Sequence, residues 1–402
     1  MPNINPEILR WARETAGFEL AEAADKIALG PAHGVDGAQR LASLEAGDVE
    51  PTRPLLLKMA KQYRRPLLTF YLSSPPAKGN RGQDFRTLPE GSTTEDEAVL
   101  DVLLRDIMAR QALIRAALED EDERRPLAWV GSASVDAGVE RLVAQLRTAL
   151  NINLASFRGA PSPEEAFRML RESVEDLGAY VVLASNLGSH HTSLGIDVFR
   201  GLAVADSLAP FVVVNDQDSR TAWSFTLMHE VAHLWLGFTG VSGGTFDRAI
   251  ERFCNQVASE ILLPASELQQ VQIRPNMSEA LLEQTISEFA VLRKVSRSMV
   301  AYRLYLQQTI SEAQWRSATR TFHLQWLGQR DRQRESTREA TGGPNYYVVR
   351  RHRLGSALLS TTARLLSSGA LTTVKASQVL GVKPNNVQAL MLGVRSSSRR
   401  AS

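Results

Sequence analysis

Two histidines and a glutamate stand in one apolar stretch of the chain, in the order His229-Glu230-x-x-His233. On a helix, residues four apart share a face, so the two imidazoles can bind one Zn²⁺ ion together. Glu230 lies about 100° round the helix and can act on a water molecule without binding the metal. The alternative is a buried helix with two incidental histidines, so the zinc interpretation needs a third ligand.

A second predicted helix, residues 247–263, offers two candidates for that ligand, Glu251 and Glu260. They are nine residues apart and therefore lie on opposite faces of the helix, so only one can reach the metal. We favour Glu251 because Ala258 and Asn255 share its face. Ala258 permits close packing of the two helices, and Asn255 can orient a ligating side chain from behind.

These segments together resemble a known family of zinc peptidases. Phe-Thr-Leu-x-His-Glu-x-x-His, Glu-x-x-Cys-Asn and Glu-Ile-Leu-Leu-Pro, which begin at Phe225, Glu251 and Glu260, resemble the ImmA/IrrE metallopeptidases. The resemblance implies a gluzincin-like site with His229, His233 and Glu251 as zinc ligands and Glu230 as general base. It also implies a protein partner: a transcriptional repressor or similar regulatory protein that is cleaved to control gene expression, as in stress responses.

The N-terminal part, residues 1–75, predicts a bundle of five helices. Leu-Ala-Glu-x-Ala from Leu20 and Leu-Glu-Ala-Gly from Leu44 resemble the Cro/CI-type (Xre) helix-turn-helix. The resemblance implies binding of double-stranded DNA, with three side chains of the recognition helix offered to the major groove: Gln39, Arg40 and Ser43. The turn before this helix is long. The alternative is a bundle that docks a protein.

The rest of the chain divides by composition. We expect a linker at 76–92, a helical connector at 93–160, an ImmA/IrrE-like zinc peptidase domain at 161–315 and a basic helical C-terminal region at 316–402. Apolar runs in the peptidase domain predict strands at 179–184, 195–204 and 210–215. Phe211–Asn215 is either an edge strand that pairs with substrate or an interior strand. The predicted fold class is mainly α with a small α+β zincin-like (gluzincin-type) domain, an N-terminal five-helix helix-turn-helix bundle and a helical C-terminal region.

The C-terminal region is rich in arginine, and residues 376–390 have the spacing of a second helix-turn-helix. Such a region can contact nucleic acid, but we favour a solvated surface on a dimer or on a substrate-docking domain. His190 and His191 lie in a polar loop, where a loop tip is favoured over a metal role. The oxyanion of the reaction needs a further donor, for which the histidine pair, Tyr180 and Tyr346 are candidates.

Composition indicates a cytoplasmic protein. No run of 18 apolar residues predicts a membrane span, no signal peptide opens the chain, and the single cysteine, Cys254, suits a reducing compartment. A homodimer is compatible with the sequence. Two other functions compete with proteolysis: a helix-turn-helix regulator or antitoxin-like protein whose zinc domain senses metal or docks a partner, and a docking module without either activity. Glu230 favours the peptidase, because a binding module has no need of a general base.

Overall fold

The computed structural model describes residues 4–76, 93–121, 125–187, 192–241, 248–274, 277–339 and 345–392. Two compact units make up the chain: Met1–Asp106 with Asn186–Val198, and Ile107–Ser185 with Phe199–Ser402. The structure is mainly helical with one small mixed sheet, which confirms the predicted class in outline. No described helix has the length and apolarity needed to cross a membrane. Most of the predicted linker, and the pair His190 and His191, fall outside the described residues.

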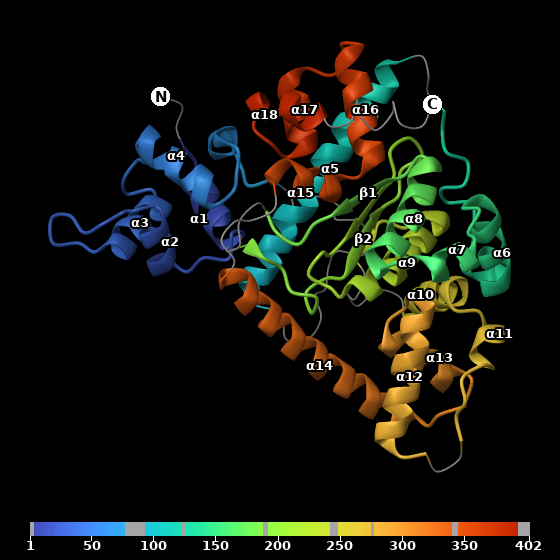
Figure 1. The fold of residues 1–402 in the computed structure, drawn as a ribbon. Helices are drawn as coiled ribbons and strands as arrows, with labels where there is room; N and C mark the ends of the chain where they lie inside the picture. The colour runs from blue at the N-terminus through green and yellow to red at the C-terminus, as the bar shows by residue number, and fades with distance from the viewer. Residues whose placement is uncertain are drawn as a thin grey trace. The chain divides into compact units, whose positions relative to one another are not determined.

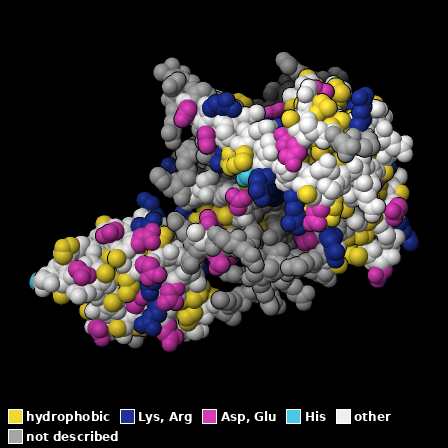
Figure 2. Space-filling view, turned by 90° about the horizontal axis from the view of Figure 1, so that it is seen from below, with side chains coloured by type: hydrophobic (Ala, Val, Ile, Leu, Met, Phe, Trp, Pro, Cys, Tyr) yellow, Lys and Arg dark blue, Asp and Glu magenta, His cyan; other side chains and the backbone are white. Residues whose placement is uncertain are grey.

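The N-terminal bundle contains four α-helices and one 3-10 helix: α1 (Pro6–Glu14), α2 (Leu20–Lys26), α3 (Gly37–Ala46), α4 (Arg53–Gln62) and η1 (Leu67–Tyr71). Its core is formed by apolar side chains from each helix, among them Ile8, Leu41, Leu56 and Phe70. The fifth predicted helix is therefore a 3-10 turn. On the face shown in Figure 2, acidic and basic side chains are intermingled over this unit, at the left of the view.

A buried ion pair joins the first and third helices of this bundle. The guanidinium of Arg13 donates to both carboxylate oxygens of Glu45, at 2.7 and 2.9 Å. The hydrogen bond to Glu45 raises the pKa of Arg13 above its usual value. The residue that follows α3 is Gly47, and its φ of 84° lies in the left-handed region. Pro6 lies so close to Gly47 that there is no room for a side chain at this position. The Leu-Glu-Ala-Gly pattern thus has a structural reason independent of DNA.

The sheet of the second unit has the order β1-β3-β2-β4, with β1 (Tyr180–Leu183), β2 (Gly201–Val204), β3 (Phe211–Val214) and β4 (Gly240–Val241) (Figure 1). β3 pairs in parallel with β1 and antiparallel with β2, so both of its edges are occupied. The hypothesis that Phe211–Asn215 pairs with substrate is wrong. A continuous run of buried apolar residues indicates a strand covered on both faces, and it does not indicate whether the edges of that strand are paired.

The predicted strand at 195–204 is shorter in the structure. Only its last four residues are extended, because residues 196–198 form a turn in which the Val198 amide donates to the Gly195 carbonyl at 3.1 Å. β4 has no counterpart among the predicted strands. Two residues are too few to establish the alternation by which strands are recognised.

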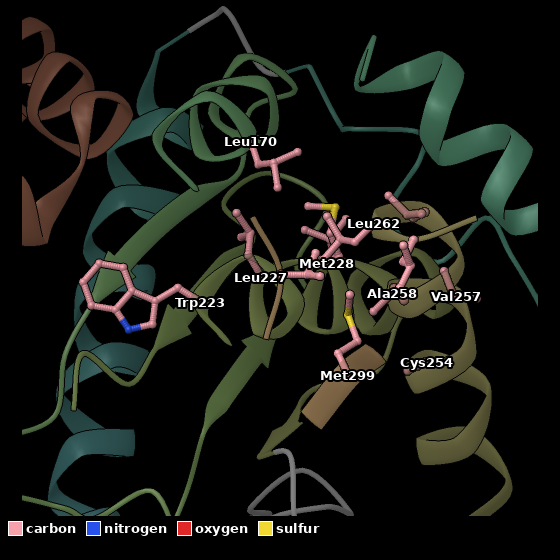
Figure 3. Packing of buried hydrophobic residues seen from close by; sticks show 14 of the residues in the cluster. Leu170, Trp223, Leu227, Met228, Cys254, Val257, Ala258, Leu262 and Met299 are labelled. Atoms are coloured by element: carbon pink, nitrogen blue, oxygen red, sulfur yellow. The ribbon is translucent and has the colours of Figure 1, made fainter. Parts of the chain in front are cut away.

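Helix α9 (Arg220–Leu236) lies on β2 and β3 between two other helices, α8 (Pro163–Asp176) and α10 (Arg248–Leu262). Nearly every residue from Trp223 to Leu236 is buried, as expected for a helix at the centre of a domain. Figure 3 shows Leu227 and Met228 of α9 packed beside Leu170 of α8 and Ala258 of α10. The remaining elements of this part are α5 (Thr94–Asp120), η2 (Val135–Ala137), α6 (Val139–Ala149), α7 (Leu154–Gly159), α11 (Ala265–Leu268), α12 (Glu279–Arg293), α13 (Arg297–Leu306) and α14 (Glu312–Glu339).

The last four helices are anchored to the same core: α15 (Tyr346–Leu354), α16 (Ser356–Ser367), α17 (Thr373–Leu380) and α18 (Pro384–Met391). The anchor is a buried ion pair on α8, in which Arg171 Nε lies 3.0 Å from Glu175 Oε1. Arg171 also donates to the His352 carbonyl at the end of α15, at 2.6 Å. Glu175 accepts the Ser356 amide at the start of α16, at 3.1 Å. One ion pair therefore satisfies two helix ends at once.

Candidate metal centre

The centre is built on α9, and the core around that helix fixes its side chains. His229, Glu230 and His233 are 3, 0 and 6% exposed. The helix ends at Gly237, which has a left-handed φ of 76° and donates its amide to the Leu234 carbonyl. Because the helix is surrounded by apolar packing, the three polar side chains have little freedom to move away from one another.

The two imidazoles and one carboxylate lie at distances that suit a tetrahedral metal. His229 Nε2 is 3.0 Å from His233 Nε2. The oxygens of Glu251 are 3.4 Å from His229 Nε2 and 3.3 Å from His233 Nε2. With bonds of about 2.0–2.1 Å, ligand atoms around a tetrahedral Zn²⁺ lie about 3.3 Å apart. The two imidazole nitrogens and the Glu251 carboxylate can therefore share one such ion, and among the described residues these three side chains form the group that could hold a metal.

The other candidate ligand, Glu260, is engaged elsewhere. One of its carboxylate oxygens pairs with Arg303 of α13, and the other accepts the Ala265 amide at 3.2 Å. These contacts join the end of α10 to α13 and α11. The two glutamates on opposite faces of α10 therefore have different partners: Glu251 faces the histidines, and Glu260 contacts α13 and α11.

The charges around the site favour metal binding. Burial alone raises the pKa of Glu251, but hydrogen bonds to the two histidines outweigh it and lower the pKa from 4.5 to about 2. Burial lowers the pKa of His233, and the neighbouring His229 adds to this effect. At neutral pH the centre therefore offers an ionised carboxylate and, at His233, a neutral imidazole, which are the forms that bind metals.

Gly201, the first residue of β2, lies close to the Glu230 carboxylate and limits where that carboxylate can move. A Cβ atom built on Gly201 would lie 2.4 Å from Glu230 Oε1 and 2.6 Å from Thr226 Cγ2. Only glycine fits at this position, because any other side chain would collide with the carboxylate. The glycine brings the strand close to the helix, and Glu230 is thereby confined beside the two histidines.

A cavity of about 360 Å³ opens over the centre. Its walls come from α9, α10, the residue before β2, and the first turns of α13, through residues that include Arg200, Phe225, Ser296, Met299 and Tyr302. Of the predicted oxyanion donors, Tyr180 is instead buried against Thr361 and Tyr346 is 54% exposed, and neither lines this cavity. Tyr302 lines it, and burial raises the pKa of its hydroxyl.

Asn255 and Cys254 are neighbours on α10, and as expected Asn255 faces the metal centre and Cys254 is buried in the core. Asn255 lines the cavity one turn after Glu251. Burial lowers the pKa of His229, but contacts with Glu251, Glu230 and Asn255 outweigh this effect, so the pKa is raised overall. Cys254 is fully buried, and burial raises its pKa well above its usual value, so the thiol packs as a small apolar side chain.

The three residues predicted to contact DNA lie on α3, in the N-terminal unit. Gln39 is exposed, whereas Arg40 and Ser43 are half-buried. The Arg40 guanidinium donates to the Gly30 carbonyl in the turn before the helix. That contact must break before Arg40 can reach a base. DNA binding by these side chains remains a prediction.

Residues 177–305 match the family model of the IrrE N-terminal-like domain, a family of peptidases. The matched segment runs from β1 to α13 and includes all the residues of the centre. The match supports a metallopeptidase-like domain in this part of the chain, as expected from the sequence. It does not extend to the N-terminal bundle. No curated protein and no solved structure matches the chain.

Proposed function

We propose that the protein is a zinc-dependent endopeptidase that cleaves a transcriptional repressor or similar regulatory protein. The observation that carries the proposal is the group formed by His229, His233 and Glu251, with Glu230 beside it at the floor of an open cavity. A metal store or a structural zinc site has no use for an unligated carboxylate held next to the ion. The peptidase family match over residues 177–305 supports the same conclusion.

His229, His233 and Glu251 are the residues that would hold the metal. Two imidazoles and one carboxylate are a common ligand set for catalytic Zn²⁺, and they leave a fourth position for the reaction. A bound zinc ion supplies Lewis acidity, which polarises a peptide carbonyl and makes water a better nucleophile. Asn255, which lies near His229, helps to keep the imidazole in its ligating orientation.

Glu230 performs the proton transfers. Its carboxylate accepts the proton of the attacking water and then delivers it to the nitrogen of the leaving amine. The close contact with Gly201 restricts the carboxylate to one position, so the base needs little reorganisation during the reaction. Such preorganisation matters here, because the other carboxylate among the described residues that line the cavity, Glu251, is committed to the histidines.

The Tyr302 hydroxyl is our candidate for the second donor to the developing oxyanion. Tyr302 is on α13 and lines the same cavity as Glu230, and burial raises the pKa of its hydroxyl, which therefore stays protonated. A neutral O–H can donate a hydrogen bond to negative charge as it forms. Phe225 and Met299 make the neighbouring wall apolar, which suits the side chain of an extended peptide.

The N-terminal bundle would bring the enzyme to its target, either by binding DNA or by docking the regulatory protein. The alternative function is a helix-turn-helix regulator or antitoxin-like DNA-binding protein whose zinc domain senses metal or docks a partner without proteolysis. The two functions differ in their need for Glu230, because metal binding and docking do not depend on a general base.

The test compares the wild-type chain with Glu230→Gln. Both proteins are loaded with Zn²⁺ and incubated with the native proteome of the source cell, and new protein N-termini are identified by labelling and mass spectrometry. We expect specific cleavage by the wild type and a loss of at least about two orders of magnitude in the variant. Zinc content should be equal in both, because Glu230 is not a ligand.

Two controls make the result decisive. His233→Ala, which lacks a ligand, should lose both zinc and cleavage, and metal chelation should abolish cleavage by the wild type. The same new N-termini appearing equally with Glu230→Gln would contradict the proposal. Zinc binding without any specific cleavage by the wild type would favour the regulator.

A further inference from the structure

The last three helices form a compact unit of the kind that enters a DNA groove. α17 ends at Leu380, a turn of three residues follows, and α18 begins at Pro384. Two helices joined by a turn of three or four residues that contains glycine are the pattern of a helix-turn-helix. α16 precedes them and packs on α17, so the arrangement has three helices.

The turn between α17 and α18 is fixed by its surroundings. Gly381 has a left-handed φ of 57°, and a Cβ atom there would lie 2.2 Å from the guanidinium of Arg350. The Val382 amide returns to the Ser377 carbonyl at 3.0 Å, which closes the end of α17. Apolar residues of the two helices are fully buried: Ala376, Val379, Leu380, Val387 and Leu390. The relative placement of α17 and α18 is therefore rigid.

The charge of this segment is one-sided. Residues 345–392 contain four arginines and two lysines but no aspartate or glutamate, although 44 of the 402 residues of the chain are acidic. At that average a segment of this length carries about five acidic residues. The segment itself therefore contributes no negative charge that would repel a polyanion.

The arginines of this segment are largely occupied within the protein. Arg350 and Arg351 donate to the Leu380 and Leu390 carbonyls, where they cap α17 and α18. Arg353 pairs with Asp216, at 2.7 Å, and Arg364 pairs with Glu121. Arg364 is exposed but ion-paired, so the exposed cations of this segment without an ion pair among the described residues are the two lysines.

Several of the side chains that α17 and α18 expose are of the types that bind DNA. Lys375, on the first turn of α17, and Lys383, immediately before α18, are exposed. Neither has an ion pair among the described residues. On α18, Asn385 and Gln388 are exposed and three residues apart, so they share the face opposite the buried Val387. Lysine suits the phosphates, and amide side chains can bond the edge of adenine in the major groove.

The N-terminal bundle has no such excess of basic over acidic residues. Residues 1–75 carry nine basic and nine acidic residues, and the acidic ones include the exposed Asp36 and Glu50 next to the predicted recognition helix. Arg40 is engaged with its own turn. Electrostatics therefore favours the C-terminal helices, rather than α3, as the site of DNA contact.

We propose that α16–α18 bind double-stranded DNA, with α18 in the major groove, Lys375 and Lys383 on the phosphates, and Asn385 and Gln388 toward the bases. A second DNA-contacting part at the end of the chain goes beyond the proteolytic function and does not depend on it. The exposed lysines, which have no ion pair among the described residues, and the exposed amides fit a polyanion better than they fit a protein partner of mixed charge.

The experiment measures binding of the full-length chain to a fluorescent DNA duplex of mixed sequence and about three helical turns. Fluorescence anisotropy is recorded at about 50 and about 200 mM salt. We expect Lys375→Glu with Lys383→Glu to weaken binding at least tenfold at the lower salt concentration and to reduce the salt dependence by about two charges. Asn385→Ala with Gln388→Ala should leave the salt dependence unchanged and reduce discrimination among duplexes of different sequence.

The matched controls carry the same number of substitutions elsewhere. Arg320→Glu with Arg332→Glu reverses two exposed charges on α14 and is the matched control, whereas Gln39→Ala with Arg40→Ala tests the competing prediction that α3 contacts DNA. Both should bind as the wild type does, and circular dichroism should show equal folding in all variants. No binding by the wild type at the lower salt concentration would overturn the proposal. So would a loss confined to the α3 or α14 variant, or lysine variants that bind DNA normally but lose cleavage of a protein substrate, which would make this surface a protein-docking site.

Discussion

Gly201→Ala is the substitution that most directly tests how the base is positioned. The added Cβ would lie 2.4 Å from Glu230 Oε1 and 2.9 Å from its Cδ, whereas ordinary contacts begin at 3.4 Å. The strand cannot easily retreat, because β2 pairs with β3 on one side and β4 on the other. The carboxylate must therefore move by about 1 Å.

A displacement of this size at a reacting group costs about a hundredfold in rate. We expect kcat/KM for the cleaved protein to fall about 100-fold, which corresponds to about 2.7 kcal/mol of transition-state stabilisation. The metal ligands are not displaced, so zinc content measured by elemental analysis should remain that of the wild type. The collision with Thr226 adds about 1–3 kcal/mol of destabilisation, visible as a lower melting temperature.

The control is Gly328→Ala on α14, where a Cβ atom meets nothing within 4 Å. It should cleave the substrate at the wild-type rate. Wild-type kcat/KM in Gly201→Ala would refute the argument, because the carboxylate would then not depend on β2 for its position. Loss of zinc from Gly201→Ala would also refute it, since the disturbance would extend beyond the base.

Three further predictions concern the ligands, the oxyanion and pH. Glu251→Ala should lose most of its zinc, whereas Glu260→Ala should retain zinc and lose the contacts with Arg303 and the Ala265 amide. Elemental analysis of both variants checks this, and the opposite result would make Glu260 the ligand. Tyr302→Phe should lower kcat about 100-fold with little change in KM, since the hydroxyl acts on charge that forms in the transition state; an unchanged kcat would remove Tyr302 from that role. In the metal-free protein, the lowered pKa of Glu251 stabilises the fold fully above pH 4.5, and this contribution disappears as the pH falls toward about 2. Melting temperatures measured across that range should fall less in Glu251→Gln than in the wild type, and equal slopes would contradict the assignment.

The placement of the His-Glu-x-x-His motif could be predicted because its geometry is local. His229 and His233 are one helical turn apart, so their shared face follows from the periodicity of the helix alone. Glu251 required an argument about which face of α10 meets α9, and Ala258 supplied it. Tyr302, our candidate for the second donor, was not among the predicted donors because it lies far along the chain on α13 and reaches the cavity only through tertiary packing.

Strand β3 and the arginines at 350–353 show a different limit of prediction from sequence. The apolar run of β3 predicted burial correctly, but burial does not distinguish an edge from an interior strand when the alternation of polar residues is absent. The arginines at 350–353 indicated a basic surface, yet two of them cap helices and the third pairs with Asp216. Composition counts charges and does not reveal which way they point.

The charge balance of the centre gives an independent reason to expect a divalent cation. Glu230 is fully buried, Glu251 is largely buried, and the lowered pKa of His233 keeps that imidazole neutral at physiological pH. Two carboxylates buried in one site are costly, because a low-dielectric interior stabilises anions poorly. In the metal-free protein, burial lowers the pKa of His229, but contacts with Glu251 and Glu230 outweigh it and raise that pKa overall. A divalent cation bound by His229, His233 and Glu251 would offset both negative charges. It would thereby stabilise the deprotonated form of Glu230, which is the form that the proposed reaction requires.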